Sequence, residues 1–529
     1  MLNTVMGRGG MVTAPHHLAS QAGAEILRDG GNAIEAMLAM AATIAVVYPH
    51  MNGIGGDGFW LIAEPGGAPV GIQACGPAAA RATRDLYAGG GHRSLPTRGG
   101  LAALTTAGTI AGWEHAFGIS KRIGGRRSLG DLVANAIGHA REGISASDSQ
   151  ARITAEKIGE FRDVPGFATF YLIDGALPRR GARMTNRTLA ETLEHLAHAG
   201  LRDFYEGDVA ASLAKDLEAA GSPVTKADLA ATSAKIVEPL SVMLDGVRLF
   251  NMPPPTQGVA SLLILATYER LKPDSRDDFQ LVHGLVESTK QAFLVRDAGV
   301  WDPAYMAEPP AALLEDRRID AVAARIDPQR ALPWPQTAAP GDTVWMGAID
   351  KTGRAVSFIQ SLYWEFGSGV VSESPGIVWQ NRGISFSLDP KHPNRLEPGR
   401  LPFHTLNPAM ARFDDGRTMV YGTMGGEGQP QTQAAIFARY HWAGYELQEA
   451  ITAPRWLLGR TWGNASTNLK LESRFPEMLF DRLRAAGHEI EAIAPFSDLV
   501  GHAGAIVRHA DGLIEGASDP RSDGSAVGI

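Results

Sequence analysis

Residues 33–47 form the segment that most restricts how this chain can fold. The run AIEAMLAMAATIAVV is apolar nearly all round, and Glu35 is its only charged residue. A helix without a polar face has to be buried, so the segment predicts a central helix packed on all sides. Asn32 can cap this helix, and Glu35 three residues later completes a capping box. The run is too short to span a bilayer, which needs about 20 residues.

The composition is that of a globular protein. The 529 residues are 44% hydrophobic and 20% charged, enough for one large domain or a few smaller ones. The net charge of -8 argues against nucleic acid as a partner. Cys75 is the only cysteine, so neither an intrachain disulfide nor a cysteine-based metal site is expected. Residues 1–11 lack the pattern of a secretory signal. We therefore expect a soluble, cytoplasmic protein without a membrane segment, metal or cofactor.

The secondary-structure pattern changes near residue 343. Helical spacing of apolar residues dominates before this point, and strand patterns dominate after it. Helices are expected at 20–28, 33–47, 129–142, 188–198, 209–220, 281–297, 431–442 and 475–486. Strands are expected at 59–63, 355–362, 369–371, 376–380, 409–413 and 418–422. The pattern predicts a helix-rich first part and a sheet-rich second part.

A glycine cluster, GIGGDG at residues 53–58, separates the apolar helix from the expected strand at 59–63. Glycine-rich loops can cradle phosphate, but such loops follow a strand and open a helix, and this cluster does neither. Glycines also allow two backbones to approach closely. The pattern therefore favours a tight turn with close backbone packing.

Residues 341–350, GDTVWMGAID, carry the strongest chemical signal. A strand pattern begins at Thr343, after a connector rich in proline and alanine at 332–340. If the bond between Asp342 and Thr343 were cut, Thr343 would carry a hydroxyl and a free α-amine. That amine has a pKa of about 8, so it could act as the base for its own hydroxyl. Threonine is also an ordinary strand residue, and this stretch alone leaves the question open.

Ordered motifs along nearly the whole chain resemble those of the γ-glutamyltranspeptidase family of N-terminal nucleophile hydrolases. They lie at residues 14–23, 30–33, 49–58, 204–207, 253–255, 453–455 and 516–524. The resemblance implies an α+β fold, a four-layer αββα sandwich. It also implies self-cleavage between Asp342 and Thr343. The products would be a large subunit, 1–342, and a small subunit, 343–529, which form the sandwich jointly.

The resemblance also implies roles for individual residues. Thr343 would attack an amide carbonyl, and the backbone N–H groups of Gly425 and Gly426 would stabilise the oxyanion. Glycine suits this role because it lets a substrate approach the backbone closely. Ser361 matches the hydroxyl residue that supports the nucleophile, although it is equally an ordinary strand serine.

The positions that hold the γ-glutamyl group in transpeptidases carry other residues here. Gln73 replaces an arginine, Tyr363 an asparagine, Ser385 an aspartate, and His404 with Thr405 a pair of serines. The two charged ends of a γ-glutamyl group would then lack charge partners. Because unpaired buried charges are unfavourable, we expect weak γ-glutamyl binding.

Arg382 lies where the family has a neutral amide. A single guanidinium suits a small mono-anion bound through two hydrogen bonds, with His404 as a second donor. The chain most resembles the oxamate amidohydrolase branch, in the runs 13–23 and 44–62; these enzymes are cytoplasmic and belong to purine-ring degradation. Oxamate has a carboxylate beside its amide and no amine, which agrees with Ser385. The resemblance implies hydrolysis of oxamate to oxalate and ammonia through an ester of Thr343.

Other functions remain open. A cephalosporin or glutaryl acylase uses the same fold and nucleophile but needs a longer pocket. A γ-glutamyltransferase or glutathione hydrolase would need a rearranged clamp. A non-catalytic scaffold would need neither the junction at Asp342 and Thr343 nor the glycine pair. The expected partners are a small anionic amide and the second processed subunit, and two such αβ heterodimers could associate.

Overall fold

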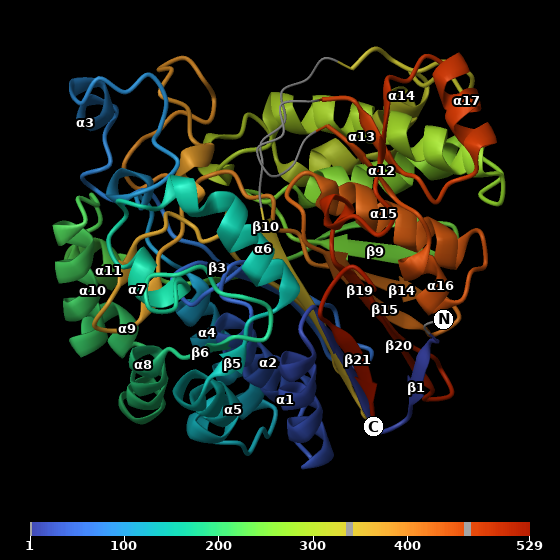
Figure 1. Ribbon diagram of the computed structural model, residues 1–529. Coiled ribbons are helices and arrows are strands. Elements are labelled where there is room, and N and C mark those ends of the chain that lie inside the picture. The colour runs from blue at the N-terminus through green and yellow to red at the C-terminus, as the bar shows by residue number, and fades with distance from the viewer. Residues whose placement is uncertain (1–2, 335–341, 460–466) are drawn as a thin grey trace.

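Four layers make up the molecule, which a computed structural model describes for residues 3–334, 342–459 and 467–529. Two seven-stranded sheets lie face to face in the middle, and helices cover the outer face of each (Figure 1). This arrangement buries one face of each helix and both faces of each sheet. The predicted αββα sandwich is therefore confirmed.

The first sheet holds the strand that begins beside Thr343. Its order is β21 (Ser525–Gly528), β2 (Gly10–Ala14), β10 (Asp342–Asp350), β11 (Ala355–Tyr363), β3 (Asp57–Ala63), β4 (Val70–Ala74) and β7 (Lys235–Val237). β10 pairs antiparallel with β2 on one side and with β11 on the other. Segments from before and after residue 343 thus alternate within one sheet.

The second sheet also mixes early and late segments. Its order is β1 (Val5–Gly7), β20 (Ile514–Ser518), β19 (Ala503–Arg508), β15 (Thr418–Thr423), β14 (Ala409–Phe413), β9 (Val247–Asn251) and β8 (Leu240–Leu244). The expected change from helix to sheet near residue 343 is a difference in proportion only, because strands from the first part contribute to both sheets.

The predicted central helix is α2 (Ala33–Val47), and all its residues are buried. The Asn32 side chain accepts from the N–H groups of Ile34 and Glu35, and the Glu35 carboxylate accepts from the N–H of Asn32. The capping box is therefore confirmed. α2 packs against α1 (His17–Arg28), α4 (Thr109–Arg122) and α5 (Leu129–Glu142), and against β10 and β11 of the first sheet.

The outer face of the second sheet is covered by α12 (Gly258–Leu271), α13 (Asp278–Gly299), α15 (Gly428–His441) and α16 (Leu447–Thr452). Figure 1 shows these helices on the side of the molecule opposite α1, α2 and α5. The other helices are α3 (Arg84–Gly89), α6 (Asp148–Lys157), α7 (Phe167–Tyr171), α8 (Arg187–Ala199), α9 (Asp203–Glu206), α10 (Asp208–Ala219), α11 (Lys226–Ala231), α14 (Asp316–Ala323) and α17 (Glu477–Ala485). The remaining strands are β5 (Ile144–Ser145), β6 (Arg183–Met184), β12 (Val371–Ser372), β13 (Ile377–Val378), β16 (Trp456–Leu458), β17 (Leu469–Glu472) and β18 (Ile490–Ile493). No helix in the described part of the chain combines the length and hydropathy that a membrane crossing requires.

Several predicted boundaries differ from the structure: the strand expected at 369–371 is Val371–Ser372, and the helices expected at 281–297 and 475–486 are Asp278–Gly299 and Glu477–Ala485. Two further differences have a clear cause. The helix expected at 20–28 begins earlier, at His17, because the His16 ring accepts from the N–H of Leu18 and caps it. The strand expected at 376–380 covers only β13. Gln380 instead donates its N–H to Gly55, and Asn381 donates its N–H to Leu362. These hydrogen bonds to distant segments draw the chain out of the strand and into a turn.

Trp345 fills the space between the sheets two residues after Thr343. Its indole Nε1 donates to the hydroxyl of Ser357 at 2.9 Å. A Cβ atom at Gly422 would lie 2.2 Å from the indole ring, and one at Gly504 would lie 2.7 Å from it. Both glycines of the second sheet therefore leave room for this ring. The contact fixes the beginning of β10 against the opposite sheet.

Two motif segments of the second part meet in a buried ion-pair network. Arg455 pairs with Asp519, and Arg521 pairs with both Asp519 and Glu472. Burial alone would raise the pKa of Asp519, but the two arginines outweigh it and lower this pKa to about 2. Because these charges are satisfied by one another, the segments around Arg455 and Asp519 support the fold.

Candidate active site

Thr343 lies at an irregularity of the first sheet. Asp342 is opposite Tyr363 and Val344 is opposite Gln360, so Ser361 and Leu362 together face Thr343. This extra residue makes a β-bulge in β11, and bulges redirect side chains. Thr343 is buried. Residues 335–341, most of the predicted connector, are outside the described part of the chain.

The Thr343 hydroxyl meets the hydroxyl of Ser361. Thr343 Oγ1 donates to Ser361 Oγ at 3.2 Å, and the N–H of Tyr363 donates to the same Oγ at 2.8 Å. Tyr363 has a φ of 85°, which is unfavourable for a residue with a side chain. The predicted contact between Ser361 and Thr343 is thus present in the geometry, and a strained backbone lies beside it.

Gly425 and Gly426 form the turn between β15 and α15. Their φ values are 111° and 54°, a region that favours glycine. Within the described residues, neither N–H group donates a hydrogen bond. The turn leads into the first turn of α15 at Gly428, where the helix dipole adds partial positive charge. The turn therefore has the properties of an oxyanion-binding site.

The side chain of Gln257, the residue that precedes α12, fixes this turn. Its Nε2 donates to the carbonyl groups of Thr405 and Gly426, both at 2.8 Å. Its Oε1 accepts from Arg296 at 2.9 Å, and Arg296 also pairs with Glu427 at 2.9 Å. Arg296 and Glu427 are buried. A charged network thus holds the glycine turn in place.

Arg382 begins a short 3-10 helix, Arg382–Ser385, and is 1% exposed. Its guanidinium carbon lies 3.8 Å from the centre of the Tyr363 ring. Its Nη1 donates to Thr405 Oγ1 at 3.3 Å, whereas Nε and Nη2 have no hydrogen-bond partner among the described residues. Burial lowers the pKa of Arg382 to about 10, so the group remains cationic at neutral pH.

Two series of contacts join Arg382 to the reacting groups. One runs through the Tyr363 ring and backbone to Ser361 and then to Thr343. The other runs through Thr405 and Gln257 to Gly426. The predicted nucleophile, the glycine turn and the predicted anion-binding side chain therefore belong to one connected site.

Asp57 and His404 are fully buried in the same region. Asp57 Oδ1 accepts from the N–H groups of Gly76 and Gly108, at 3.0 and 2.9 Å. His404 Nε2 lies 3.5 Å from Asp57 Oδ2, too far for an ordinary hydrogen bond. Burial, and to a smaller extent the positive charge of Arg382, lowers the pKa of His404 well below its usual value, so this imidazole is neutral. His404 is therefore a neutral hydrogen-bonding group and adds no positive charge.

The glycine cluster packs backbone against backbone, as predicted. A Cβ at Gly55 would lie 2.2 Å from the carbonyl oxygen of Val378, and one at Gly56 would lie 2.1 Å from that of Ser361. Any side chain at Gly56 would therefore displace the bulge that faces Thr343. The prediction of a tight turn with close packing is confirmed.

Two of the predicted binding residues make no side-chain hydrogen bond to the other site residues in the described part of the chain. Gln73 is buried on β4, opposite Phe59 of β3, and its side chain has no hydrogen bond to the described site residues. Ser385 contributes its carbonyl to Asn394, and its hydroxyl has no hydrogen-bond partner among the described residues. Direct substrate contact by Gln73 or Ser385 stays a prediction.

A second buried polar cluster lies beside the glycine turn. It contains Tyr48 and three histidines around it. The ring centroids of His16, His50 and His502 lie 5.8, 4.4 and 6.5 Å from that of Tyr48. The carbonyl of His502 accepts from the N–H of Met424, next to the glycine pair. Burial lowers the pKa of all three histidines, so they are neutral at neutral pH.

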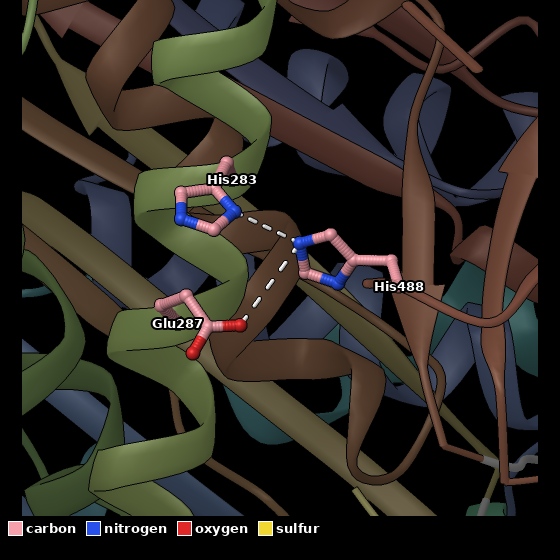
Figure 2. Close-up of side chains that lie close together, drawn as sticks. All are labelled: His283, Glu287 and His488. Carbon is pink, nitrogen blue, oxygen red and sulfur yellow. Dashed lines mark hydrogen bonds and ion pairs between the residues drawn. The ribbon is translucent and has the colours of Figure 1, made fainter. Parts of the chain in front are cut away.

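One group of three side chains in the described ranges has the composition of a metal site. His283 and Glu287 lie one turn apart on α13, and His488 faces them (Figure 2). Their ligand atoms lie within 4.8 Å of one another, and all three residues are buried. This cluster is separate from the residues around Thr343.

Hydrogen bonds already satisfy this cluster. His283 Nε2 donates to the carbonyl of Asp327 at 3.0 Å, which leaves Nδ1 to accept from His488 Nε2 at 2.9 Å. The Lys290 ammonium lies 2.6 Å from Glu287 Oε1 and takes the place that a cation would occupy there. The Glu287 carboxylate also accepts from the N–H of Leu332, and the Lys290 ammonium donates to the carbonyl of Leu332. The cluster therefore anchors the chain near Leu332 and gives no reason to assign a metal.

Sequence reasoning missed Asp57, Gln257, Arg296 and Glu427. Signals in the sequence could have pointed to two of them. Asp57 is the only charged residue in a glycine cluster that precedes a buried strand, and Arg296 is a charged residue near the end of a helix that the structure shows to be mostly buried. Only the fold, however, shows what these side chains contact.

Comparisons with known proteins agree with this geometry. The family model for gamma-glutamyltranspeptidase matches residues 19–529. The chain is 54% identical over 520 residues to the oxamate amidohydrolase proenzyme of Klebsiella pneumoniae, with 98% of each chain covered. It is 40% identical to a glutathione hydrolase-like proenzyme of Bacillus subtilis, with 100% of each covered.

A solved cephalosporin acylase from Bacillus halodurans has the same fold, with a TM-score of 0.91 at 31% identity; 100% of this chain and 97% of that one are covered. Fold and relatives together define an amidohydrolase with the architecture of the N-terminal nucleophile hydrolases. The chain belongs to the γ-glutamyltranspeptidase family.

The first prediction concerns self-cleavage. Purified protein should run as two bands, and the smaller one should begin at Thr343. Thr343→Ala should run as one full-length band, because alanine has no hydroxyl to attack the carbonyl of Asp342. Ser361→Ala keeps the nucleophile but loses its hydrogen bond, so it should process more slowly. N-terminal sequencing of the smaller band checks this, and a different first residue or cleavage of Thr343→Ala would contradict it.

Proposed function

We propose that this protein cleaves itself before Thr343 and then hydrolyses oxamate to oxalate and ammonia. The proposed subunits are residues 1–342 and 343–529, joined as an αβ heterodimer. The name of the Klebsiella pneumoniae relative supports the substrate, and the names of both curated relatives as proenzymes support processing. A cytoplasmic location and a place in purine-ring degradation belong to the same proposal and rest on the resemblance.

Self-cleavage needs only groups at the junction. The Thr343 hydroxyl attacks the carbonyl carbon of Asp342, and the C–N bond breaks as an ester forms. Water then hydrolyses the ester, which leaves a carboxylate on Asp342 and a free α-amine on Thr343. The position of Thr343 at the edge of a bulge, with Ser361 beside its hydroxyl, supports this step.

Substrate hydrolysis repeats this chemistry on a bound amide. The α-amine of Thr343 takes the proton from the Thr343 hydroxyl, whose oxygen attacks the amide carbon. The N–H groups of Gly425 and Gly426 stabilise the oxyanion. The ammonium gives its proton to the leaving nitrogen, ammonia departs, and water hydrolyses the remaining oxalyl ester. The N–H groups of the glycine turn donate no hydrogen bond to the described residues, which supports this assignment.

The buried guanidinium of Arg382 is the observation that carries the substrate proposal. It forms no ion pair with a carboxylate among the described residues, and two of its nitrogens lack hydrogen-bond partners. Leaving such groups unsatisfied in the interior is unfavourable. A bound carboxylate would supply the missing charge and two parallel hydrogen bonds. Oxamate places its carboxylate directly beside the amide that Thr343 would attack.

A γ-glutamyl or glutathione hydrolase is the second candidate. Asp57 lies in the same region as Arg382, so both charge signs that a γ-glutamyl group needs are present. The name of the Bacillus subtilis relative agrees with this alternative. Burial raises the pKa of Asp57 to about 7, however, which makes it a poor partner for an ammonium group. A glutaryl acylase is disfavoured because Arg382, His404 and Asp57 are all buried close to the nucleophile.

The second prediction tests substrate choice. Processed protein should release ammonia from oxamate far faster than from glutamine, glutathione or a glutaryl amide. Transfer from γ-glutamyl-p-nitroanilide to glycylglycine should stay near background, because the single anion-binding group favours a substrate without an amine. Ammonia release at matched enzyme concentrations gives the comparison. Faster turnover of any γ-glutamyl compound than of oxamate would overturn the proposal in favour of the second candidate.

The third prediction concerns Arg382. Arg382→Gln should lower kcat/KM for oxamate by about tenfold to a few hundredfold, because a hydrogen bond to a charged group contributes about 1.5–3 kcal/mol. Most of the loss should appear in KM if the arginine binds the ground state. Arg382→Lys should recover part of it, since lysine lacks the planar two-point contact. Self-cleavage should persist.

Steady-state kinetics on fully processed variants provides the measurement for Arg382. Arg439 is a matched control, because it is also buried and its pKa is also lowered to about 10, yet it lies at the far end of α15. Arg439→Gln should change KM for oxamate much less than Arg382→Gln. An unchanged kcat/KM in Arg382→Gln would mean that the carboxylate is bound elsewhere.

A further inference from the structure

Asp57 lies in the same row of side chains as the nucleophile. Asp57 of β3 is directly opposite Ser361 of β11, and Ser361 in turn contacts Thr343 of β10. Directly opposed residues in antiparallel strands project on the same face of a sheet. That face is the inside of the sandwich, where Phe59 and Trp345 pack between the sheets. Asp57 therefore faces the same site as Thr343, with β11 lying between the strands of these two residues.

The two oxygens of Asp57 have different surroundings. Oδ1 accepts two backbone hydrogen bonds, from Gly76 and Gly108. Oδ2 is buried and makes no short hydrogen bond to the described residues. His404 Nε2 lies 3.5 Å from Oδ2, and the Gln380 side chain stabilises the ionised carboxyl group through a longer hydrogen-bonding contact. Since Oδ1 is already occupied as an acceptor, a proton on this carboxyl group would reside on Oδ2.

Three buried side chains thus carry unpartnered polar atoms in one region of the described structure. These atoms are Asp57 Oδ2, both ring nitrogens of His404, and Nε and Nη2 of Arg382. Arg382 acts electrostatically on both Asp57 and His404, so the three groups are near one another. Five such atoms together indicate a site built for a small polar ligand.

We propose that Asp57 is a specificity-determining residue that carries a proton on Oδ2 and, through it, donates a hydrogen bond to the substrate carboxylate beside Arg382. The proposal rests on the function proposed above and adds the charge state that the site needs. Oxamate would thus bind together with one proton taken from solvent. No covalent bond of the substrate changes in this step.

Charge balance supports this assignment. With Asp57 ionised, its charge cancels that of Arg382, and a bound mono-anion would leave a net negative charge in the interior. With Asp57 protonated, Arg382 and the anion balance each other. Unbalanced buried charge is strongly unfavourable, and two carboxylates that share one site raise the pKa of one of them. A small mono-anion therefore favours the protonated form.

The other ionisable groups near Asp57 do not alter this balance. Arg382, the first residue of the short 3-10 helix, is the cation near Asp57, and burial keeps His404 neutral. Cys75, after the end of β4, and Tyr205 of α9 both have pKa values raised by burial and by Asp57, so they are neutral. Burial also raises the pKa of Asp57 itself to about 7, although Arg382 and two backbone N–H groups oppose the shift.

The sign of the pH effect follows from this pKa. Protonated Asp57 binds oxamate, so ionisation of Asp57 should lower kcat/KM on the alkaline side of the profile, by up to tenfold per pH unit. The Thr343 α-amine must lose its proton to act as base, and its pKa is about 8. The wild-type profile should therefore be bell-shaped, with the alkaline fall due to Asp57.

The fourth prediction compares pH profiles of kcat/KM for ammonia release from oxamate, between pH 6 and 9, on processed proteins. Asp57→Asn keeps a hydrogen-bond donor but cannot ionise, so it should lose the alkaline fall. Asp57→Ala has no donor and should be at least about tenfold less active than Asp57→Asn at the acidic end. Asp302→Asn is the matched control, a buried aspartate whose oxygens accept from Ala304 and Leu401; it should keep the alkaline fall.

Each outcome decides between the proposals. If wild-type protein hydrolyses oxamate but Asp57→Asn keeps the alkaline fall, or is as inactive as Asp57→Ala, the role of Asp57 is overturned and the oxamate function stands. If wild-type protein releases no ammonia from oxamate at any pH, both are overturned. Loss of the alkaline fall in Asp57→Asn alone, with partial recovery relative to Asp57→Ala, supports the proposal.

Discussion

The pairing of β10 between β2 and β11 is the constraint on which the rest of the site depends. Hydrogen bonds on both edges hold this strand in the middle of the first sheet. The Trp345 ring also fixes it against Gly422 and Gly504 of the second sheet. Apart from the pairing of Asp342 with Tyr363, these contacts lie after Thr343, so cutting the chain before Thr343 would leave them intact. A strand held in this way can present a new N-terminus without rearrangement.

The site around this strand contains features that would be unfavourable in an ordinary core. Tyr363 has a positive φ, Arg382 is buried with two unpartnered nitrogens, and Asp57 has one unpartnered oxygen. Such features concentrate where the surrounding structure enforces them for function. Here the enforcement comes from close backbone packing at Gly56 and from the Gln257 hydrogen bonds. A bound anion would satisfy the unpartnered groups near Arg382.

Local sequence signals predicted some elements well and others poorly. The capping box of α2 and the bounds of α5 follow from neighbouring residues, and the structure confirms them. The placement of Arg382 near the nucleophile came from a family resemblance, since no local pattern distinguishes it from a surface arginine. The strand expected at 376–380 is shorter because its last residues bond to Gly55 and Leu362, which are distant in sequence.

Asp57 shows why the remainder could not be predicted. Within the glycine cluster it had the pattern of a turn residue, yet its partners are Gly76, Gly108 and, through space, Arg382. These residues come together only when β3, β11 and the turn at Arg382 are assembled. Gln257 is similar, because its hydrogen bonds to Thr405 and Gly426 join segments more than a hundred residues apart. Sequence patterns report local structure, whereas these contacts depend on topology.

The acyl-enzyme offers the most direct test of the central claim that Thr343 is the nucleophile of an amidohydrolase. Processed protein would be mixed with oxamate, quenched in acid within the turnover time, digested and examined by mass spectrometry. The account predicts an oxalyl group on the peptide that begins with Thr343, lost when turnover is allowed to finish. Ammonia release with the adduct on another residue, or with no adduct when hydrolysis of the ester limits turnover, would contradict it.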